Sequence, residues 1–590
     1  MEKSTLPTSV EPIASRPAHK HSALRKATIA AAVLIGLRTL FYSSAAAASL
    51  FPFPSSESPL SSSTPKCQQV PALFPAHDDK LQQAFEYLST PEFVNASIIR
   101  LSGAVQIPTQ SFDDLGPIGE DERWEVFGPL HKYFAATFPR IHSELKVEKV
   151  NTHGLLYTWH GSDKALKPLV LMAHQDVVPV DPDTVDSWTY PPWSGHFDGE
   201  NVWGRGASDC KNSLVGIMES VEVLLDAGFK PKRTIVMSFG FDEECSGAQG
   251  AGHLSKFLHE RYGDDGVAAI VDEGMGYQKA FGMGYAVPGV AEKGYTDVEI
   301  VVRTPGGHSS VPQDHTSIGI LSEVITKIES VKYPTYLAQE NPYLGFLQCG
   351  AEYAPDFPKK LKKLLKKHHA KSSSSEDICP AAKKHTDRLA QEAASLGLDV
   401  RYLMQTSQAV DLISGGKKTN ALPESATAIV NHRINIGDSP KTVYDRLSSL
   451  IHPIAKTHNL TLHAFDGTKA AYNSISLSAR NTTLNVAPVT PTNVDAVTPY
   501  AVLSGTIRAL YGEETIVAPA LMTGNTDTRY YWDLTRHIFR FGPGYVNEKD
   551  WGMGRIHTVD ERVSVSNHGK VVKWYALWIQ NVDGARFEGE

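Results

Sequence analysis

The 590-residue sequence contains few cysteines and little excess charge. Its five cysteines show no CxxC pair and no zinc-finger spacing, which argues against a metal site built from thiolates. The net charge of −8 gives no reason to expect nucleic acid as a partner. The absence of a GxxxxGK[ST] sequence excludes a phosphate loop of that kind. What remains is an ordinary globular composition, with 41% hydrophobic and 21% charged residues.

An apolar stretch near the N-terminus, residues 27–50, is interrupted by Arg38 and preceded by basic residues. A bilayer span needs about 20 residues, so the stretch predicts a signal anchor with a cytoplasmic tail at 1–26 and a lumenal body. A cleaved signal peptide, cut near residues 45–49, is the alternative. The following Ser- and Pro-rich residues 51–76 predict a stalk.

Three Asn-X-Ser/Thr triplets begin at Asn95, Asn459 and Asn481, and they predict glycosylation. Together with the apolar stretch they favour a lumenal protein. In that compartment some cysteines pair, and an odd count leaves at least one unpaired within the chain. The pattern does not assign the pairs.

The chain is too long for one ordinary hydrophobic core, so we expect two globular domains. Strand and helix signals alternate from residue 77 to about 294, which predicts an α/β domain with a largely parallel sheet. Residues 297–303 and 426–434 alternate like strands with one exposed face. We therefore predict an inserted α+β domain over 295–470, with the chain returning to the first domain for 471–590.

A lysine-rich segment, residues 359–367, lies within the predicted insertion. Leu361, Leu364 and Leu365 share one helical face, so a helix for a membrane surface or a partner is one reading. A solvated surface helix is the other, and we favour it because the apolar face is only a few residues long.

Three predicted strands end in polar side chains. The apolar run from Leu169 ends at His174 and Asp176, residues 234–241 lead into Glu243 and Glu244, and residues 267–271 lead into Asp272. Open α/β sheets bind ligands at the carboxyl ends of their strands. A histidine and several carboxylates at three strand ends therefore predict one metal site assembled from distant parts of the sequence.

A glycine-containing loop, residues 203–211, precedes a predicted helix over 213–227 that ends at Gly228. Its glycines permit a tight backbone close to a site. Asp209 stands at the end of this loop, where one carboxylate can bridge two cations.

These motifs occur in an order that resembles the co-catalytic zinc carboxypeptidase and aminoacylase family. The resemblance rests on six segments over residues 75–590: His174-x-Asp176, the loop ending at Asp209, 242–244, 272–274, 306–310 and 556–561. It implies a zinc-peptidase-type α/β catalytic domain with a mixed, largely parallel sheet, plus an inserted α+β domain that acts as a lid or dimerisation domain. Any one segment is weak alone, whereas six in order are specific.

The resemblance also implies a ligand set for two Zn²⁺ ions per subunit. Asp209 bridges both ions, His174 and Asp272 hold one, and Glu244 and His557 hold the other. All-N/O ligands suit zinc, although cobalt and manganese also fit. Three protein ligands per ion leave a position for a shared water, which is typical of catalytic rather than structural sites. Family members also have a cis peptide bond after the bridging aspartate, here between Asp209 and Cys210.

Three further residues receive catalytic roles from the resemblance. Glu243 is the general base, and Asp176 hydrogen-bonds the second nitrogen of His174. His308, in the insertion, stabilises the oxyanion, often across a dimer. Cys210 and Cys245 follow proposed ligands, but we read them as buried thiols or one local disulfide without a catalytic role.

A free C-terminal carboxylate of a substrate needs a cation, best an arginine. Arg529 and Arg433 are the candidates, and Asn420 matches a family asparagine near the substrate. We therefore predict a carboxypeptidase that acts on short peptides, and the resemblance adds a Gly-Xaa preference. An N-acyl amino acid hydrolase or synthase, or a non-catalytic membrane-tethered binding protein, are the alternatives.

The anchor, stalk and glycosylation triplets match vacuolar members of the family. We therefore expect a single-pass protein with its body in the vacuole lumen, and a secreted protein if the apolar stretch is cleaved. A homodimer is the expected assembly.

Overall fold

The computed structural model describes residues 67–372, 387–468, 472–480, 483–545 and 554–590. The predicted tail and anchor, most of the stalk, Cys379 and Asn481 lie outside these residues. Within them, no helix combines the length and the apolar character that crossing a membrane would require. Of the other two glycosylation candidates, Asn95 and Asn459 both have exposed side chains.

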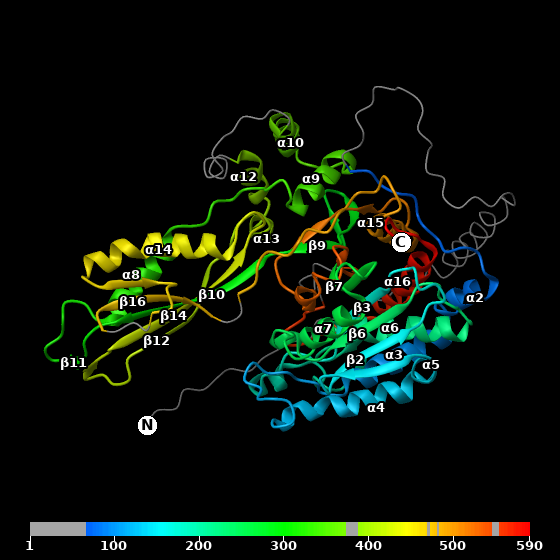
Figure 1. Cartoon of the computed structure of the whole chain (residues 1–590), viewed down its shortest axis with the longest axis horizontal. Coiled ribbons are helices and arrows are strands. Elements are labelled where there is room, and N and C mark those ends of the chain that lie inside the picture. The colour runs from blue at the N-terminus through cyan, green and yellow to red at the C-terminus, as the bar shows by residue number, and fades with distance from the viewer. Residues whose placement is uncertain (1–66, 373–386, 469–471, 481–482, 546–553) are drawn as a thin grey trace, which may run out of the picture. The chain divides into compact units, whose positions relative to one another are not determined.

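The main sheet has ten strands among the described residues. Eight of them are hydrogen-bonded in the order β1-β2-β6-β3-β7-β19-β9-β18, while β8 pairs with β7, and β17 pairs with β8. Its centre is parallel: β6 (Ile235–Gly240), β3 (Leu169–His174), β7 (Ala269–Ala280) and β19 (Ile538–Tyr545) run the same way. Antiparallel neighbours flank it (Figure 1). The remaining strands are β1 (Lys146–Val150), β2 (Gly154–Trp159), β8 (Met283–Ala286), β9 (Gly289–Glu292), β17 (Ile516–Val517) and β18 (Ala520–Met522). The predicted mixed, largely parallel α/β sheet is confirmed.

Both faces of this sheet are covered, and its central strands β3 and β6 are buried at every position. Along β3, Leu169, Leu171 and Ala173 face one core, while Val170 and Met172 face the other. The first core is covered by α3 (Pro91–Val105), α6 (Lys211–Asp226), α15 (Pro499–Tyr511) and α16 (Val565–Gly584). The second core is covered by α7 (Ala251–Tyr262). The side chains of these strands are thus buried on both faces of the sheet.

Helix α6 forms where the sequence predicted it. It starts at Lys211, directly after the loop that ends at Asp209, and Gly228 follows it with φ +79°. Glycine tolerates this left-handed backbone without a Cβ clash, so it ends the helix. Because α6 packs against α16 and β3, the loop before it is held at the carboxyl end of the central strands (Figure 1).

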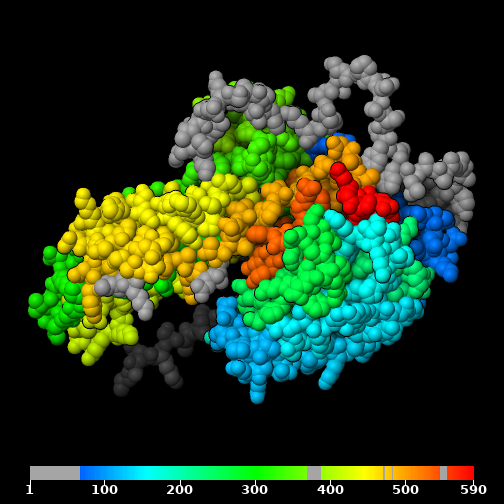
Figure 2. Space-filling view, viewed as in Figure 1, coloured from blue at the N-terminus to red at the C-terminus, as the bar shows by residue number. Residues whose placement is uncertain are grey.

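The second sheet has five strands in the order β12-β14-β10-β16-β15. Its bounds are β10 (Gly294–Arg303), β12 (Ala409–Gly415), β14 (Ser425–Ile434), β15 (Thr461–Ala464) and β16 (Ser474–Ala479). Buried residues alternate along β10 and β14, as predicted. Helices α8 (Ser317–Ser330) and α14 (Pro440–Thr457) cover one face, and α14 forms part of the outer surface (yellow in Figure 2). We call residues 294–335 and 405–480 the second-sheet region; β16 carries it past the expected end at 470.

Four of the helices that the structure describes between β10 and β12 contribute to a core other than that of the second sheet. They are α9 (Pro342–Tyr353), α10 (Lys359–Ser372), α12 (Arg388–Ala394) and α13 (Leu398–Tyr402). Their apolar side chains share a core with residues of β8, β17 and β18, at the edge of the main sheet. A disulfide joins Cys67 to Cys349 of α9. The sequence predicted these helices as part of the insertion's own fold, whereas they cover the main sheet's edge.

The lysine-rich segment forms α10, as predicted. Leu361 and Leu365 are buried against the neighbouring helices, while Lys359, Lys362 and Lys366 are exposed. The apolar face of α10 is therefore covered by the protein itself, which supports the reading as a solvated surface helix.

The remaining helices are α2 (Asp79–Tyr87), α4 (Phe127–Thr137) and α5 (Pro139–Glu144), with the short 3-10 turns η1 (Glu122–Val126), η2 (Pro182–Ser187), η3 (Glu243–Cys245) and η4 (Asp527–Tyr530). Strand β20 (Arg562–Ser564) pairs with β5 (Asn201–Trp203), which pairs with β4 (His196–Phe197). Strands β11 (Gly307–His308) and β13 (Ala421–Leu422) pair with each other.

Candidate metal centre

His174 ends β3 and is the buried centre of the candidate site. Its Nε2 atom lies 3.1 Å from Oδ1 of Asp209, which stands at the N-terminal end of α6. Its Nδ1 atom lies 3.0 Å from the backbone carbonyl oxygen of Asp176 and 3.2 Å from Oδ1 of the same residue, so both groups of Asp176 are near the second nitrogen. The peptide bond between Asp209 and Cys210 is cis, as the resemblance implied.

Asp176 connects His174 to the two glutamates of η3. Its Oδ1 accepts a hydrogen bond from the backbone N–H of Glu243 at 3.1 Å, and its Oδ2 accepts one from that of Glu244 at 3.1 Å. Ser111 donates its hydroxyl to Oδ2 at 2.6 Å. A single buried carboxylate therefore fixes the imidazole and the start of the turn that carries both glutamates.

His557 reaches the same place from the other end of the chain. Its Nε2 atom lies 3.0 Å from Oδ2 of Asp209 and 3.1 Å from Oε2 of Glu244. The two oxygens of Asp209 thus face two different histidines, His174 and His557. This is the arrangement that a carboxylate bridging two cations requires.

The structure corrects one predicted ligand, because Glu273 rather than Asp272 faces His174. Oε1 of Glu273 lies 3.5 Å from Nε2 of His174. Asp272 pairs across the sheet with Arg540, its Oδ1 accepts the N–H of Glu273, and it stands in neither of the candidate metal-binding groups among the described residues. Successive residues of a strand point to opposite faces, and the sequence could not say which of the two acidic residues faced inward.

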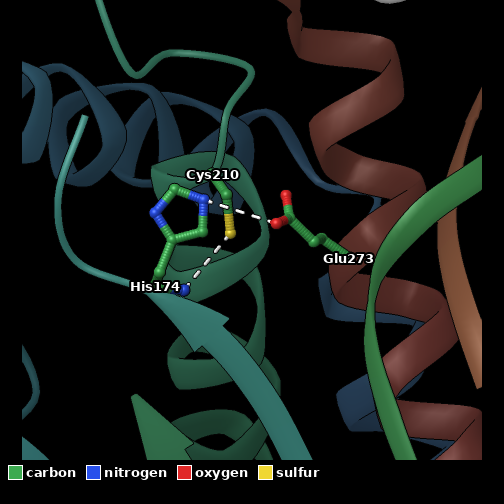
Figure 3. Close-up of side chains that lie close together, drawn as sticks. All are labelled: His174, Cys210 and Glu273. Carbon is green, nitrogen blue, oxygen red and sulfur yellow. Dashed lines mark hydrogen bonds and ion pairs between the residues drawn. The ribbon is translucent and has the colours of Figure 1, made fainter. Parts of the chain in front are cut away.

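The two groups that can hold a metal ion share His174. One contains Asp209 and Glu244, and the other contains Cys210 and Glu273. In Figure 3 the carboxylate of Glu273 points toward the imidazole, while Sγ of Cys210 lies against the backbone nitrogen of His174, 3.5 Å away. Burial raises the pKa of the Cys210 thiol, so the thiol stays protonated. Neither Cys210 nor Cys245 forms a disulfide.

The centre concentrates negative charge. Burial is the main cause that raises the pKa values of Glu243 and Glu244 above the ordinary value of a glutamate, and neighbouring acidic groups add to it. The same two causes raise the pKa of Glu273 to about 8. His174 and His557 are close to these carboxylates and have raised pKa values. The buried imidazole of His174, the exposed imidazole of His557 and four partly buried carboxylates offer the N and O donors that divalent zinc prefers, so the residues fit a metal pair.

Arg529 is the candidate cation that lies closest to the proposed base. Its Nη2 atom is 3.7 Å from Oε1 of Glu243, and its Nε donates to the carbonyl of Thr526. Arg433 lies at the end of β14, where Nη1 donates to Oδ1 of Asn525 at 3.0 Å. Arg529 therefore belongs to the segment 524–529, and Arg433 contacts the same segment from the second sheet.

His308 and Asn420 lie together but away from the centre. The N–H of Ser309 donates to the carbonyl of Asn420, and the side chains of His308 and Asn420 are exposed on the β11–β13 pair. Nδ1 of His308 contacts the hydroxyl of Ser310 at 2.7 Å. Within the part of the chain that the structure describes, no contact joins either residue to the candidate metal centre.

Sequence reasoning gave no role to Glu561, although the residue stood in the last motif. It is fully buried and contacts the loop that carries Asp209. A glutamate four residues after a predicted ligand was the available signal.

The comparisons with known proteins agree with this geometry. The family model described as Peptidase family M20/M25/M40 matches residues 170–581. Carboxypeptidase S of Saccharomyces cerevisiae is 42% identical over 537 residues, covering 88% of this chain and 89% of that protein. The N-fatty-acyl-amino acid synthase/hydrolase PM20D1 of Homo sapiens is 31% identical over 491 residues, covering 82% of this chain and 87% of that protein.

Solved structures show the same fold at low sequence identity. Human carnosine dipeptidase 1 has a TM-score of 0.58 at 15% identity, covering 87% of this chain and 100% of that chain. The metallo-carboxypeptidase Sso-CP2 of Sulfolobus solfataricus has a TM-score of 0.53 at 17% identity, covering 86% of this chain and 100% of that chain. The family match, the order of the motifs and the clustering of their residues lead to one conclusion: the chain belongs to peptidase family M20/M25/M40.

Proposed function

We propose that the protein is a dinuclear zinc carboxypeptidase that releases the C-terminal residue from short peptides, with a preference for Gly-Xaa. The observation that carries the proposal is the carboxylate of Asp209, which lies 3.1 Å from His174 and 3.0 Å from His557, with Glu243 beside them. Similarity to Carboxypeptidase S over most of both chains supports the choice of reaction.

His174, Asp209 and Glu273 would hold one ion, and Asp209, Glu244 and His557 would hold the other. When bound, a pair of divalent cations lowers the pKa of a shared water and polarises the scissile carbonyl. Glu273 takes the position that the resemblance gave to Asp272, because its carboxylate is the one near His174.

Glu243 is the proton carrier of the proposed reaction. Its carboxylate accepts the proton of the attacking water and delivers it to the nitrogen of the leaving amino acid. Burial and the neighbouring carboxylate of Glu273 raise the pKa of Glu243, which favours delivery of the proton to the leaving amine. Asp176 accepts a hydrogen bond from the backbone N–H of Glu243, and this bond fixes the backbone position of Glu243 in the turn.

Arg529 is the proposed anchor for the free carboxylate of the substrate. A guanidinium forks to a carboxylate with two parallel hydrogen bonds. Its distance of 3.7 Å from Glu243 puts the substrate's end close to the base. Arg433 and Asn420 are secondary candidates for substrate contacts, from the second-sheet region.

The proposal is tested by metal analysis of the purified protein combined with a dipeptide assay. We expect about two zinc ions per chain, hydrolysis of glycyl dipeptides, loss of activity on chelation and recovery when zinc is returned. A metal-replete protein that hydrolyses neither a dipeptide nor an N-acyl amino acid would contradict the proposal and leave a non-catalytic binding protein.

A second candidate function is hydrolysis or synthesis of N-acyl amino acids. The observation that favours it is the 31% identity to PM20D1 over 82% of this chain. Both reactions use an amide next to a free carboxylate, so they differ in the acyl pocket. A higher kcat/KM for a long-chain N-acyl amino acid than for a glycyl dipeptide would select this function.

We further propose a homodimer that joins through the second-sheet region. Strand β12 is an edge of the second sheet, and it exposes Leu412 and Ile413 at 58% and 62%. Edge strands with exposed apolar side chains favour pairing with another strand. A second copy would also supply His308 to a site that lacks it within one chain. Sedimentation of the wild type and of Ile413→Lys tests this assembly.

The proposed location is the lumen of the vacuole, with attachment to the membrane through residues 27–50. The disulfide between Cys67 and Cys349 supports an oxidising compartment, and exposed Asn95 and Asn459 are available for glycosylation. Glycosidase sensitivity of the full chain and its extraction from membranes by detergent but not by carbonate test these assignments.

A further inference from the structure

The carboxylate of Glu561 accepts several hydrogen bonds from the loop that carries Asp209. Its Oε1 atom accepts three backbone N–H groups, those of Gly206, Ser208 and Asp209, at 3.1, 3.0 and 3.1 Å. Its Oε2 atom accepts Nη1 of Arg205 at 2.6 Å. Successive N–H groups aimed at one anion hold a loop in a single conformation.

Glu561 also belongs to the segment that carries His557. The N–H of Gly204 donates to the carbonyl of Glu561 at 2.9 Å, and Arg562 pairs with Trp203 in the β20–β5 ladder. Nη1 of Arg205 also lies 3.4 Å from the carbonyl of Thr558, the residue after His557. Glu561 therefore joins two segments about 350 residues apart through both its backbone and its side chain.

His557 has little packing of its own. Its side chain is 49% exposed, and its backbone adopts φ +58°. Its imidazole contacts Asp209 and Glu244, which are residues of the candidate centre itself. The distance between His557 and Asp209 therefore depends on groups that join their two segments, and Glu561 is a buried side chain that does so.

Burying this carboxylate has a cost that only its partners offset. Arg205 and Glu561 are 5% and 0% exposed, and removing one partner of such a pair leaves the other charge uncompensated. The guanidinium of Arg205 also lies over the ring of Trp188, 5.4 Å from its centroid. An apolar residue at 561 would satisfy neither the three N–H groups nor the guanidinium.

We propose that Glu561 is a positioning residue that sets the spacing between Asp209 and His557, so that the two can hold one metal ion together. This inference rests on the proposed function, since it concerns the same centre. It assigns Glu561 no contact with substrate or metal. Its role is to hold the carboxylate of Asp209 and the exposed imidazole of His557 at a fixed distance from each other.

The chain contains a matched control for this role. Glu590 is a second buried glutamate that pairs with a buried arginine, Arg233, and accepts the backbone N–H groups of Lys167 and Phe587. The pair shares the chemistry of the Arg205–Glu561 pair but lies where β3 and β6 begin, at the opposite end of these strands from the proposed ligands. Glu590→Gln should therefore lower stability without weakening the metal centre.

The experiment compares wild type, Glu561→Gln and Glu590→Gln as full chains. Zinc loss is followed against increasing chelator, alongside thermal unfolding and dipeptide kinetics. We expect Glu561→Gln to lose one zinc at a chelator concentration about 10–100-fold lower than wild type, with kcat reduced and KM nearly unchanged. Excess zinc should restore part of its activity. Glu590→Gln should unfold at lower temperature but retain zinc like wild type.

Equal zinc retention in Glu561→Gln and Glu590→Gln, with similar losses of stability, would overturn the proposal and leave Glu561 a purely structural residue. If Glu561→Gln does not fold, Arg205→Lys keeps the positive charge but loses the fork, and it should show the same zinc loss in smaller degree; wild-type retention in Arg205→Lys would then overturn the proposal. A wild-type protein that binds no zinc would instead contradict the proposed function.

Discussion

The main sheet and the second sheet differ in where they keep their functional candidates. At the main sheet, His174, Asp176 and Glu561 are buried and each contacts residues from distant segments. In the second-sheet region, His308 and Asn420 are exposed on a short strand pair, above an ordinary apolar core. The residues of the first group are already positioned by contacts within the chain, whereas those of the second group would need another surface to complete a site. Each prediction below tests that division.

The largest effect should follow from Glu243→Gln. The change removes the proton acceptor but keeps the side chain's shape and the backbone hydrogen bond to Asp176. A positioned general base contributes about 10²–10⁴-fold, so kcat should fall by that amount while zinc content stays unchanged. Steady-state kinetics with metal analysis check this; near-normal turnover would remove Glu243 from the mechanism.

Next in size is His308→Ala, which tests the exposed region. An oxyanion donor contributes about 10²–10³-fold to kcat, and its loss should leave zinc binding and stability unchanged. If His308 acts across two copies, mixing this inactive variant with inactive Glu243→Gln should restore about a quarter of wild-type activity, because half of the dimers are mixed and each has one complete site. No recovery after subunit exchange would contradict a shared site.

A smaller effect separates the adjacent acidic residues of β7. Glu273 faces His174, whereas Asp272 lies opposite Arg540, so Glu273→Gln should weaken zinc binding about 10–100-fold. Asp272→Asn should change zinc binding less and stability more. Chelator titration of both variants decides the assignment, and the reverse order would return the ligand role to Asp272.

The smallest effect concerns pH and the core of the second-sheet region. Burial lowers the pKa of His432 to about 4 from an ordinary value of 6.5. The unfolded chain then binds this proton more readily than the folded one, so stability is full above pH 6.5 and falls as the pH drops toward 4. The loss between pH 7 and 5 is about 1–2 kcal/mol for one such group. His432→Gln should unfold with a smaller pH dependence in that range, measured by urea denaturation.

Much of the main sheet could be predicted from sequence because its physical signal is strong. The apolar run from Leu169 to His174 and the helix before Gly228 appear with nearly the expected bounds. Four of the five proposed ligand positions, at 174, 209, 244 and 557, also meet in the structure. Strand ends and a helix start bring these positions together, and the topology of a parallel sheet determines both.

The rest depended on information that a local pattern does not contain. Which of Asp272 and Glu273 faces inward depends on the register of β7, and both residues are equally acidic. The packing of helices α9, α10, α12 and α13 depends on which apolar surface is available to them, here the edge formed by β8, β17 and β18. The role of Glu561 depends on three backbone N–H groups far away in the chain, and sequence gives no sign of them.

The disulfide between Cys67 and Cys349 has a consequence for proteolysis. The two cysteines are 282 positions apart in the sequence, and the chain between them includes β3, α6 and the turn that carries Glu243. A nick in any exposed loop of that span would release no fragment until the sulfurs are reduced, so a cleaved molecule would migrate as intact on a non-reducing gel. A cut ahead of Cys67, by contrast, would free the whole enzyme body in one piece.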